Sequence, residues 1–184
     1  MKTLSLLLVK SDSYRLPNKN ILPFLGKPMF VWNVEKCLKI FDKVYVSSDS
    51  DEILKIAKKA GAIPIKRPKN LCGTTPNIPV YRHALKHFKT DILVAVQANS
   101  PTINPAIIST IKKMMETGLW QEIITCHKDL SIYGSVWALT AKRIRKYKYK
   151  NFYKQTPEVL LLDKSIDIHT KSDFNKAILQ ARKR

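Results

Sequence analysis

A basic loop with the sequence KSDSYRLPNKNILPFLGKPM occupies residues 10–29. It follows a short apolar run at residues 4–9, which predicts a buried strand, and it precedes an amphipathic run. A loop at the carboxyl end of a strand is the usual place for a ligand in an open α/β sheet. Its cations are Lys10, Arg15, Lys19 and Lys27, and its first hydroxyl groups belong to Ser11, Ser13 and Tyr14. Polyphosphate is the predicted ligand, and a solvated basic loop is the alternative.

Other polar side chains stand where later predicted strands end. They are residues 47–49, Arg67, the QANSP segment at residues 97–101, and Asp167 with His169. Carboxylate and amide oxygens there could supply one or two metal ligands, which together with the basic loop suits a nucleoside triphosphate held with Mg²⁺. Each group also has a structural alternative. Asp49 fits a helix cap, and the amides of Gln97 and Asn99 could bond turn backbone.

Two other kinds of site are disfavoured by the sequence. It contains no GxGxxG or Walker loop and only five glycines, so a dinucleotide or P-loop site is not expected. His83 and His87 share a predicted helix face, but no cysteine or acid stands near enough in sequence to complete a zinc site, and His127 stands alone. These histidines are expected at or near the surface.

Strands and helices alternate along most of the chain. Strands are predicted at residues 4–9, 43–47, 63–65, 92–96, 122–126, 135–139 and 159–162. Helix starts are predicted at Pro28, at Ser48 with Asp49, at Asn77 with Pro79, at Asn104 with Pro105, at Thr140, and at Thr170 with Asp173. Such alternation requires parallel strands joined by right-handed crossovers, and it predicts a doubly wound, mostly parallel α/β sheet in a single domain spanning residues 1–184.

The composition bounds the class of protein. With 184 residues, 45% hydrophobic and 26% charged, the chain is long enough for a three-layer core. Its three cysteines are far apart and odd in number, which predicts reduced thiols and a cytoplasmic protein. The run at residues 4–9 is too short for a signal peptide, and no apolar run is long enough to span a membrane.

A formal net charge of +19 makes a polyanionic partner plausible. Nucleic acid is one such partner, because residues 142–154 (KRIRKYKYKNFYK) interleave cations with aromatic rings. The side chains that would make those contacts are Arg143, Arg145, Tyr147, Tyr149 and Phe152. The alternative is a solvated surface, since lysines spread over the outer faces of nearly every predicted helix.

Several motifs occur in one order: RLPNKNILPFLGKPM, KVYVSSDSDEI, AKKAGAIPIKRP, VQANSP, GSVWAL and SIDIHTKSDF. In this order and spacing they resemble the cytidylyltransferase family, whose members make CMP-activated acidic sugars such as CMP-acylneuraminate and CMP-KDO. The resemblance implies a Rossmann-like, GT-A-like nucleotidyltransferase fold. It also implies CTP, Mg²⁺, a sugar acceptor and a homodimer. In the implied reaction, a sugar hydroxyl attacks the α-phosphorus and pyrophosphate leaves.

The resemblance also assigns expected roles to residues. Lys10, Ser13 and Arg15 stand in or beside the phosphate-binding signature. Lys19 and Asn20 match a nucleotide-facing pair, Arg67 is expected near the cytosine, and Gln97 and Asn99 fall in the strand-end motif. Asp167 matches the first of two metal-binding acids, so that Asp167, Asn99 and His169 are the expected metal ligands. Lys10, Arg15 and Asp167 are the expected catalytic residues.

The chain departs from the family pattern at three places. Tyr14 stands where the signature has a lysine, beside the added negative charge of Asp12, and His169 stands where the second acid is expected. The chain between His127 and Tyr133 is far shorter than in the family, where that segment commonly forms sugar contacts and a dimer arm. A relative that binds nucleotide without turnover is therefore the alternative to an active enzyme.

Overall fold

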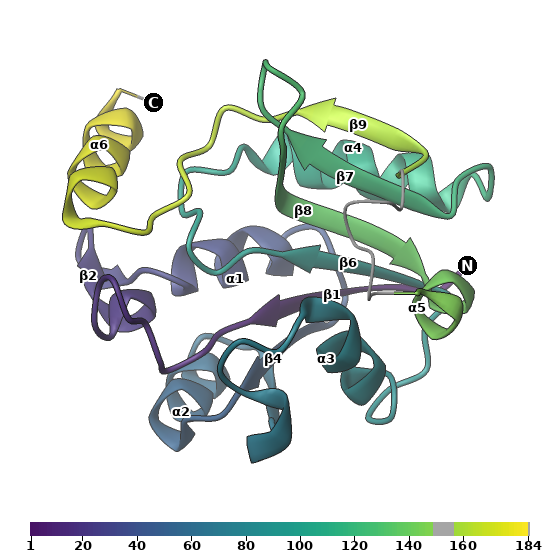
Figure 1. Cartoon of the computed structure of the whole chain (residues 1–184), viewed down its shortest axis with the longest axis horizontal. Helices are drawn as coiled ribbons and strands as arrows, with labels where there is room; N and C mark the ends of the chain where they lie inside the picture. Colours follow the sequence, from purple (N-terminus) through teal and green to yellow (C-terminus); the bar gives the residue numbers. More distant parts are fainter. Residues whose placement is uncertain (149–156, 184) are drawn as a thin grey trace.

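The computed structural model describes residues 1–148 and 157–183. Within these residues, seven strands form one sheet in the order β5-β4-β1-β6-β8-β7-β9 (Figure 1). The strands are β1 (Thr3–Leu8), β4 (Val44–Ser48), β5 (Ile63–Lys66), β6 (Ile92–Val96), β7 (Glu122–Cys126), β8 (Ile132–Thr140) and β9 (Val159–Leu162). Only β8 among them runs against the others, since it pairs antiparallel with both β6 and β7. The predicted mostly parallel sheet is confirmed.

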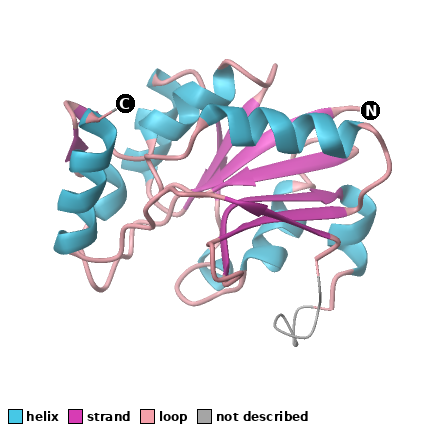
Figure 2. Cartoon of the chain, turned by 90° about the horizontal axis from the view of Figure 1, so that it is seen from above, coloured by secondary structure: helices cyan, strands magenta, loops and turns pink. Residues whose placement is uncertain are grey.

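Helices cover both faces of the sheet (Figure 2). The helices are α1 (Val31–Leu38), α2 (Asp51–Lys59), α3 (Asn77–Ala84), α4 (Pro105–Glu116), α5 (Ala141–Lys146) and α6 (Lys171–Arg182). One buried cluster joins α1, α2 and α4 to the sheet, and a second joins α3 and α5 to its opposite face. The strands β1 and β6 have side chains in both clusters, which is why their sequences are apolar without alternation.

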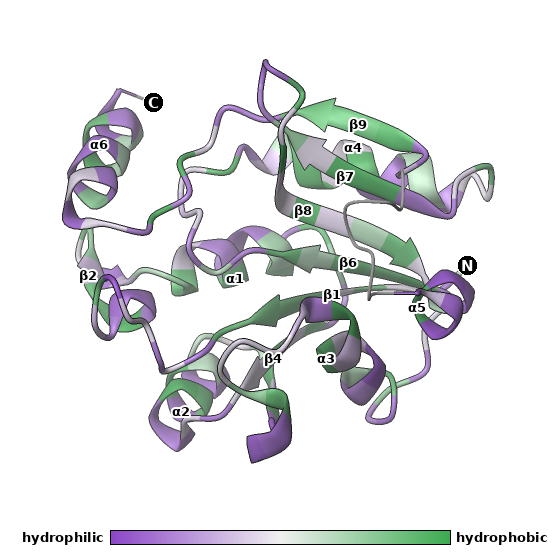
Figure 3. Ribbon diagram, viewed as in Figure 1, coloured by the Kyte–Doolittle hydropathy of each residue, from purple (hydrophilic) through white to green (hydrophobic). Residues whose placement is uncertain are grey.

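A third apolar cluster lies beyond the carboxyl ends of the strands. There α6 contributes Phe174 and Ala177, which pack with Phe24 and Met29 from the N-terminal part of the chain and with Ile168. The C-terminal helix thus lies beside the N-terminal loop, as α6 and β2 (Pro23–Phe24) do in Figure 1. In Figure 3, α6 carries both hydrophobic and hydrophilic residues, as expected of a helix with one packed face.

Two predicted helix starts are wrong. Pro28 belongs to β3 (Lys27–Pro28), which pairs with β2 through a turn at Leu25 and Gly26, both with positive φ. The helix α1 therefore begins only at Val31. Ser50, rather than Ser48 or Asp49, caps α2 by accepting a hydrogen bond from the backbone N–H of Ile53 at 3.3 Å.

The other cap predictions that rest on side-chain bonds are confirmed. Asn104 caps α4, with Pro105 in the first turn, and Thr140 caps α5. Thr170 and Asp173 form a reciprocal capping box at α6, which fixes the direction in which the chain enters that helix. The three cysteines, Cys37, Cys72 and Cys126, are free. None of the helices in the described ranges combines the length and apolar character needed to cross a membrane.

Candidate nucleotide-binding site

A cavity of about 330 Å³ opens at the carboxyl ends of β1 and β6. The first loop, the segment after β5, the turn after β6 and the C-terminal His169 all contribute to it. The predicted site residues that line it are Lys10, Ser13, Arg15, Lys19, Asn20, Arg67, Gln97, Asn99 and His169. Asp167 does not line the cavity, but its carboxylate contacts Asn99 and His169, which do. The structure therefore brings all the predicted site residues together.

Two polar atoms of the first loop are buried without a hydrogen-bond partner among the described residues. They are Oγ of Ser13 and Oδ1 of Asn20. The nitrogen of the Asn20 amide does have a partner, since Nδ2 donates to the backbone carbonyl of Lys10 at 2.8 Å. Burying an unpaired polar atom costs free energy, so such atoms on a cavity wall favour a ligand that supplies their partners. A ligand with a hydrogen-bond donor opposite Asn20 Oδ1 and a polar group opposite Ser13 Oγ would supply the missing partners of these two atoms.

Asp49 holds the start of the same loop. Its carboxylate accepts hydrogen bonds from the backbone N–H of Ser11 at 3.0 Å and from the Ser11 hydroxyl. Partial burial raises the pKa of Asp49, but these hydrogen bonds outweigh it, so that the pKa lies below its usual value. The expectation that Asp49 is a cap is wrong because its oxygens face back toward β1, where they fix the backbone between Lys10 and Ser13.

Arg67 is almost fully buried at the end of β5. Its Nη2 donates to the backbone carbonyl of Ser47 at 2.7 Å, and its Nε donates to the Ser47 hydroxyl at 3.3 Å. Burial lowers the pKa of Arg67, while the nearby Asp49 carboxylate opposes that shift. The guanidinium is therefore held rigidly against the end of β4, with part of the side chain on the cavity wall.

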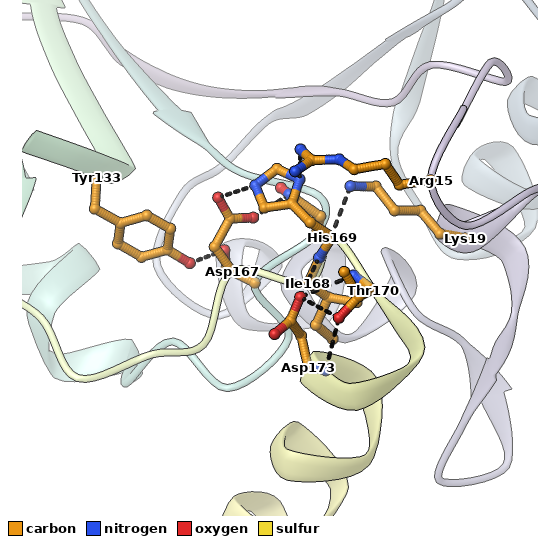
Figure 4. Close-up of polar contacts among 10 residues, drawn as sticks. Arg15, Lys19, Tyr133, Asp167, Ile168, His169, Thr170 and Asp173 are labelled. Atoms are coloured by element: carbon orange, nitrogen blue, oxygen red, sulfur yellow. Dashed lines mark hydrogen bonds and ion pairs between the residues drawn. The ribbon is translucent and has the colours of Figure 1, made fainter.

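Lys19 links the first loop to the C-terminal segment. Its Nζ donates to the backbone carbonyl of Ile168 at 2.7 Å (Figure 4). Burial lowers the pKa of Lys19, and the Asp167 carboxylate raises it in part. An ammonium group has three donors, so this bond leaves two for other partners, and Lys19 can serve both as a structural tie and as a cation in the cavity.

Arg15, His169, Asp167 and Asn99 form a continuous chain of hydrogen bonds. Arg15 Nη2 lies 2.7 Å from His169 Nδ1, and His169 Nε2 lies 2.7 Å from Asp167 Oδ2 (Figure 4). Because a guanidinium can only donate, Nδ1 must accept, which leaves the ring proton of a neutral imidazole on Nε2, where it donates to Asp167. The other carboxylate oxygen of Asp167 accepts from Asn99 Nδ2. Both oxygens of the predicted metal-binding acid therefore have donors.

The donor set fits a magnesium ion that is shared with a substrate. Mg²⁺ is commonly bound through one or two carboxylates, substrate phosphates and water, rather than by an all-protein cage. Asp167 supplies the carboxylate, and a rotated amide of Asn99 would present its oxygen beside it. No group of three or more His, Cys, Asp and Glu side chains suited to a metal occurs in the described part of the chain. A phosphate-bearing substrate would have to complete the coordination.

Tyr133 is a member of this site that the sequence did not single out. Its hydroxyl contacts Oγ of Ser100, and burial, together with the nearby Asp167 carboxylate, raises its pKa. Figure 4 shows the ring directed toward Asp167 from β8, and the imidazole of His127 stacks on it with ring centroids 4.6 Å apart. A tyrosine near a strand start carries no local signal for such a role, because Ser100 and Asp167 each lie more than thirty residues away along the chain.

The architecture is shared with solved nucleotidyltransferases. CMP:2-keto-3-deoxy-manno-octonic acid synthetase, solved in complex with CTP, superposes with a TM-score of 0.78 over 100% of both chains, at 15% sequence identity. A protein from Mycobacterium tuberculosis solved in complex with manganese gives a TM-score of 0.73 at 13% identity, over 97% of this chain and 99% of that one. At such identities the likeness establishes the fold.

The chain belongs to the cytidylyltransferase family, whose model matches residues 5–183. A pseudaminic acid cytidylyltransferase from Campylobacter jejuni is 35% identical over 117 residues, which cover 59% of this chain and 50% of that protein. The matched part thus spans half the length of that relative, and 32% of a second one with the same description. The family prediction from the ordered motifs is confirmed.

Proposed function

We propose that this chain transfers CMP from CTP to a hydroxyl group of an acidic sugar, with release of pyrophosphate. One observation carries the proposal: the N-terminal basic loop lines the cavity, and the distant Asp167 lies beside it, linked to Arg15 through His169. Lys19 joins the same two segments through the backbone carbonyl of Ile168. Membership of the cytidylyltransferase family supports the choice of CTP, and a pseudaminic acid cytidylyltransferase among the relatives supports an acidic sugar as acceptor.

The cavity residues divide into three groups in this proposal. Lys10, Ser13, Lys19 and Arg15 hold the triphosphate, where cations and hydrogen-bond donors neutralise the charge that develops on the leaving pyrophosphate. Asn20, Arg67 and Gln97 hold the nucleoside, and the rigid placement of Arg67 suits base recognition. Asp167 and Asn99, with His169 beside them, hold a divalent cation. When bound, Mg²⁺ would polarise the reacting phosphoryl group, and the manganese complex of a structural neighbour supports a divalent cation of this kind.

The proposal also includes a homodimer and a cytoplasmic location. The chain connects β7 to β8 through a short hairpin, so acceptor contacts and a homodimer interface would have to come from elements other than a long arm at that place. We place the protein in the cytoplasm, where its free cysteines would stay reduced. Light scattering after size exclusion tests the homodimer.

Pyrophosphate release tests the reaction. The protein is incubated with CTP, Mg²⁺ and a panel of keto-acid sugars, and release above the rate without acceptor supports the proposal. Thermal shift with each of the four ribonucleoside triphosphates, with and without Mg²⁺, tests the nucleotide, since a ligand of the native state alone raises stability by RT ln(1 + [L]/Kd). The absence of both acceptor-dependent release and a selective shift with CTP would contradict the proposal.

A relative that binds nucleotide without turnover is the second candidate. The observation in its favour is the state of the phosphate loop, where the Tyr14 side chain is fully exposed on the cavity rim and Lys10 lies 3.9 Å from the carboxylate of Asp12. His169 occupies the place of an acid beside Asp167. Saturable CTP binding without pyrophosphate release would favour this candidate. Restored release in a Tyr14→Lys, His169→Asp double variant would identify the losses responsible.

The basic cluster at residues 142–148 is the remaining candidate for a partner surface. Two of its side chains serve packing, because Arg143 Nε donates to the buried carboxylate of Glu122 at 2.9 Å and the Tyr147 ring is buried. Arg145 is exposed, and Tyr149 and Phe152 lie outside the described residues. Nucleic-acid binding has no support from these contacts and stays a prediction for a salt-dependent binding assay.

A further inference from the structure

Asn33 is a fully buried polar residue in the apolar core face of α1. Its Nδ2 donates to the backbone carbonyl of Gln97 at 2.8 Å and to that of Ser100 at 2.9 Å. Its Oδ1 accepts from Lys36 Nζ at 3.1 Å, and the same ammonium donates to the carbonyl of Pro101. Since both partners of the Asn33 nitrogen are carbonyl oxygens, the orientation of the amide is fixed.

The turn that Asn33 supports carries three residues of the cavity wall, of which Gln97 and Asn99 are polar and Ala98 is apolar. Asn99 is central to it: its side chain donates to Asp167, and its backbone carbonyl accepts from the N–H of Ile168 at 3.0 Å. The position of this turn therefore sets the position of the Asp167 carboxylate. Asn33 itself does not line the cavity formed by the described residues and acts only through the turn.

An apolar residue would satisfy the packing of α1 at this position, where the neighbouring buried residues are Val31, Val34 and Cys37. Such a residue would remove the side-chain donor of the Gln97 carbonyl and would leave the Ser100 carbonyl with the backbone N–H of Ile103, at 3.2 Å, as its donor. A buried carbonyl that loses its partner drives the backbone to move until it finds another, so the turn would shift or loosen. The hydrogen bonds from Asn33 to the turn after β6 thus explain why an amide is buried at this position.

We propose that Asn33 is a positioning residue for the reaction described above. It keeps the turn after β6 in the geometry that aligns Asn99 and Asp167 with the substrate phosphates. The inference rests on the proposed function. It adds to that function a residue of α1, a helix that contributes no residue to the cavity wall. Lys36 supports it by holding the amide oxygen and the far end of the same turn.

The test compares Asn33→Leu, which has nearly the same volume but no donor, with Asn104→Ala as a control. Asn104 lies just beyond the turn and caps α4 without holding the turn. In Asn33→Leu, kcat should fall about tenfold or more, because small misplacements of reacting groups have effects of this size, and the Mg²⁺ concentration for half-maximal rate should rise. KM for CTP should change less, since the basic loop and Arg67 stay in place. Asn104→Ala should change none of the three.

A second readout needs no turnover. Hydrogen exchange of the backbone amides from Gln97 to Ile103 should be faster in Asn33→Leu than in the wild type and unchanged in Asn104→Ala. Lys36→Met is the milder variant and should move the same amides in the same direction, which keeps the test available if Asn33→Leu does not fold. Unchanged exchange in the folded variants, or wild-type kinetics in Asn33→Leu, would overturn the inference. A wild-type protein without pyrophosphate release overturns the proposed function instead, and the exchange result then decides separately whether Asn33 holds the turn.

Discussion

Nε2 of His169 lies 2.7 Å from Oδ2 of Asp167, so a hydrogen-bond donor stands where a second acid is expected in this family. The neutral imidazole stabilises the Asp167 carboxylate without adding negative charge. A divalent cation is held more tightly as carboxylate ligands are added. We therefore expect His169→Asp to lower the Mg²⁺ concentration for half-maximal pyrophosphate release by about tenfold, an effect of about 1.4 kcal/mol.

A magnesium titration of initial rates measures this effect, and Mn²⁺ binding followed by electron paramagnetic resonance measures it without turnover. His87→Asp is the matched control, because His87 is exposed and pairs only with His83 in the described contacts of its ring. An unchanged metal requirement in His169→Asp would show that the second position does not face the cation.

Tyr14 offers a second way to restore the family pattern. Its side chain is fully exposed on the rim of the cavity, so a lysine there would meet no steric obstacle. An exposed cation near a triphosphate gains modest Coulomb energy, so Tyr14→Lys should lower KM for CTP by about two- to fivefold at low salt. The gain should vanish at about 0.5 M salt, where the screening length is only a few ångströms.

Steady-state kinetics at two ionic strengths provides the measurement. Tyr14→Gln is the control, since it removes the ring without adding charge and should leave KM at the wild-type value. A salt-independent gain, or an equal gain in both variants, would point to loss of the ring and not to the added charge.

Local patterns were sufficient to predict much of the fold. The continuous apolar runs at β1 and β6 predicted buried strands, and the capping residues Asn104 and Thr170 lie where the helices begin. Because ligands bind at the carboxyl ends of parallel strands, reading the residues after each strand predicted that Arg67 and Gln97 would face one cavity. That rule needs only strand positions, which short-range sequence patterns can supply.

Other features depend on contacts between distant residues and could not be predicted. The partner of Asp49 is Ser11, 38 residues away, and only the folded chain shows that its carboxylate turns away from α2. The reversed direction of β8 and the role of Asn33 depend in the same way on which segments become neighbours. The sequence did not predict the β2–β3 hairpin, because Leu25 adopts positive φ in its turn and residues other than glycine rarely adopt that conformation.

The contact between Asp49 and Ser11 predicts a pH-dependent stability. Burial raises the pKa of Asp49, but the two hydrogen bonds from Ser11 prevail, so the pKa in the folded protein lies below that in the unfolded chain. A depressed carboxyl pKa contributes stability above the unfolded-state value of about 3.9, and the contribution is lost as pH falls through the folded-state value. The carboxylate is only partly buried, so solvent screening limits its contribution: Asp49→Asn should lower the free energy of unfolding at pH 7 by at most about 1 kcal/mol, and the difference should shrink below about pH 4.

Urea denaturation between pH 3 and 7 measures the difference. Asp51→Asn is the control, because its carboxylate is largely exposed and pairs with Lys66 at the surface, where ion pairs contribute little. A difference for Asp49→Asn that stays constant down to pH 3 would mean that the pKa of Asp49 is the same in the folded and unfolded chains, so that its charge does not stabilise this contact.

The basic segment of α5 provides a test of stability and of partner choice together. The Glu122 carboxylate is 2% exposed and accepts from Arg143 Nε and from Trp137 Nε1, each at 2.9 Å. Removing the cation leaves a buried charge with one fewer partner, so Arg143→Ala should lower the free energy of unfolding by about 3 kcal/mol. Lys146→Ala, on the exposed side of α5, should stay within about 0.5 kcal/mol of the wild type.

Urea denaturation again gives these free energies, and titration with a single-stranded oligonucleotide at several salt concentrations gives the partner readout. If Arg143 serves packing, Arg143→Ala changes stability while oligonucleotide binding stays as weak as in the wild type. A wild-type affinity that falls steeply with salt and is reduced by Lys146→Ala would instead assign this surface to nucleic acid, since the loss of one phosphate contact reduces the salt slope by about one.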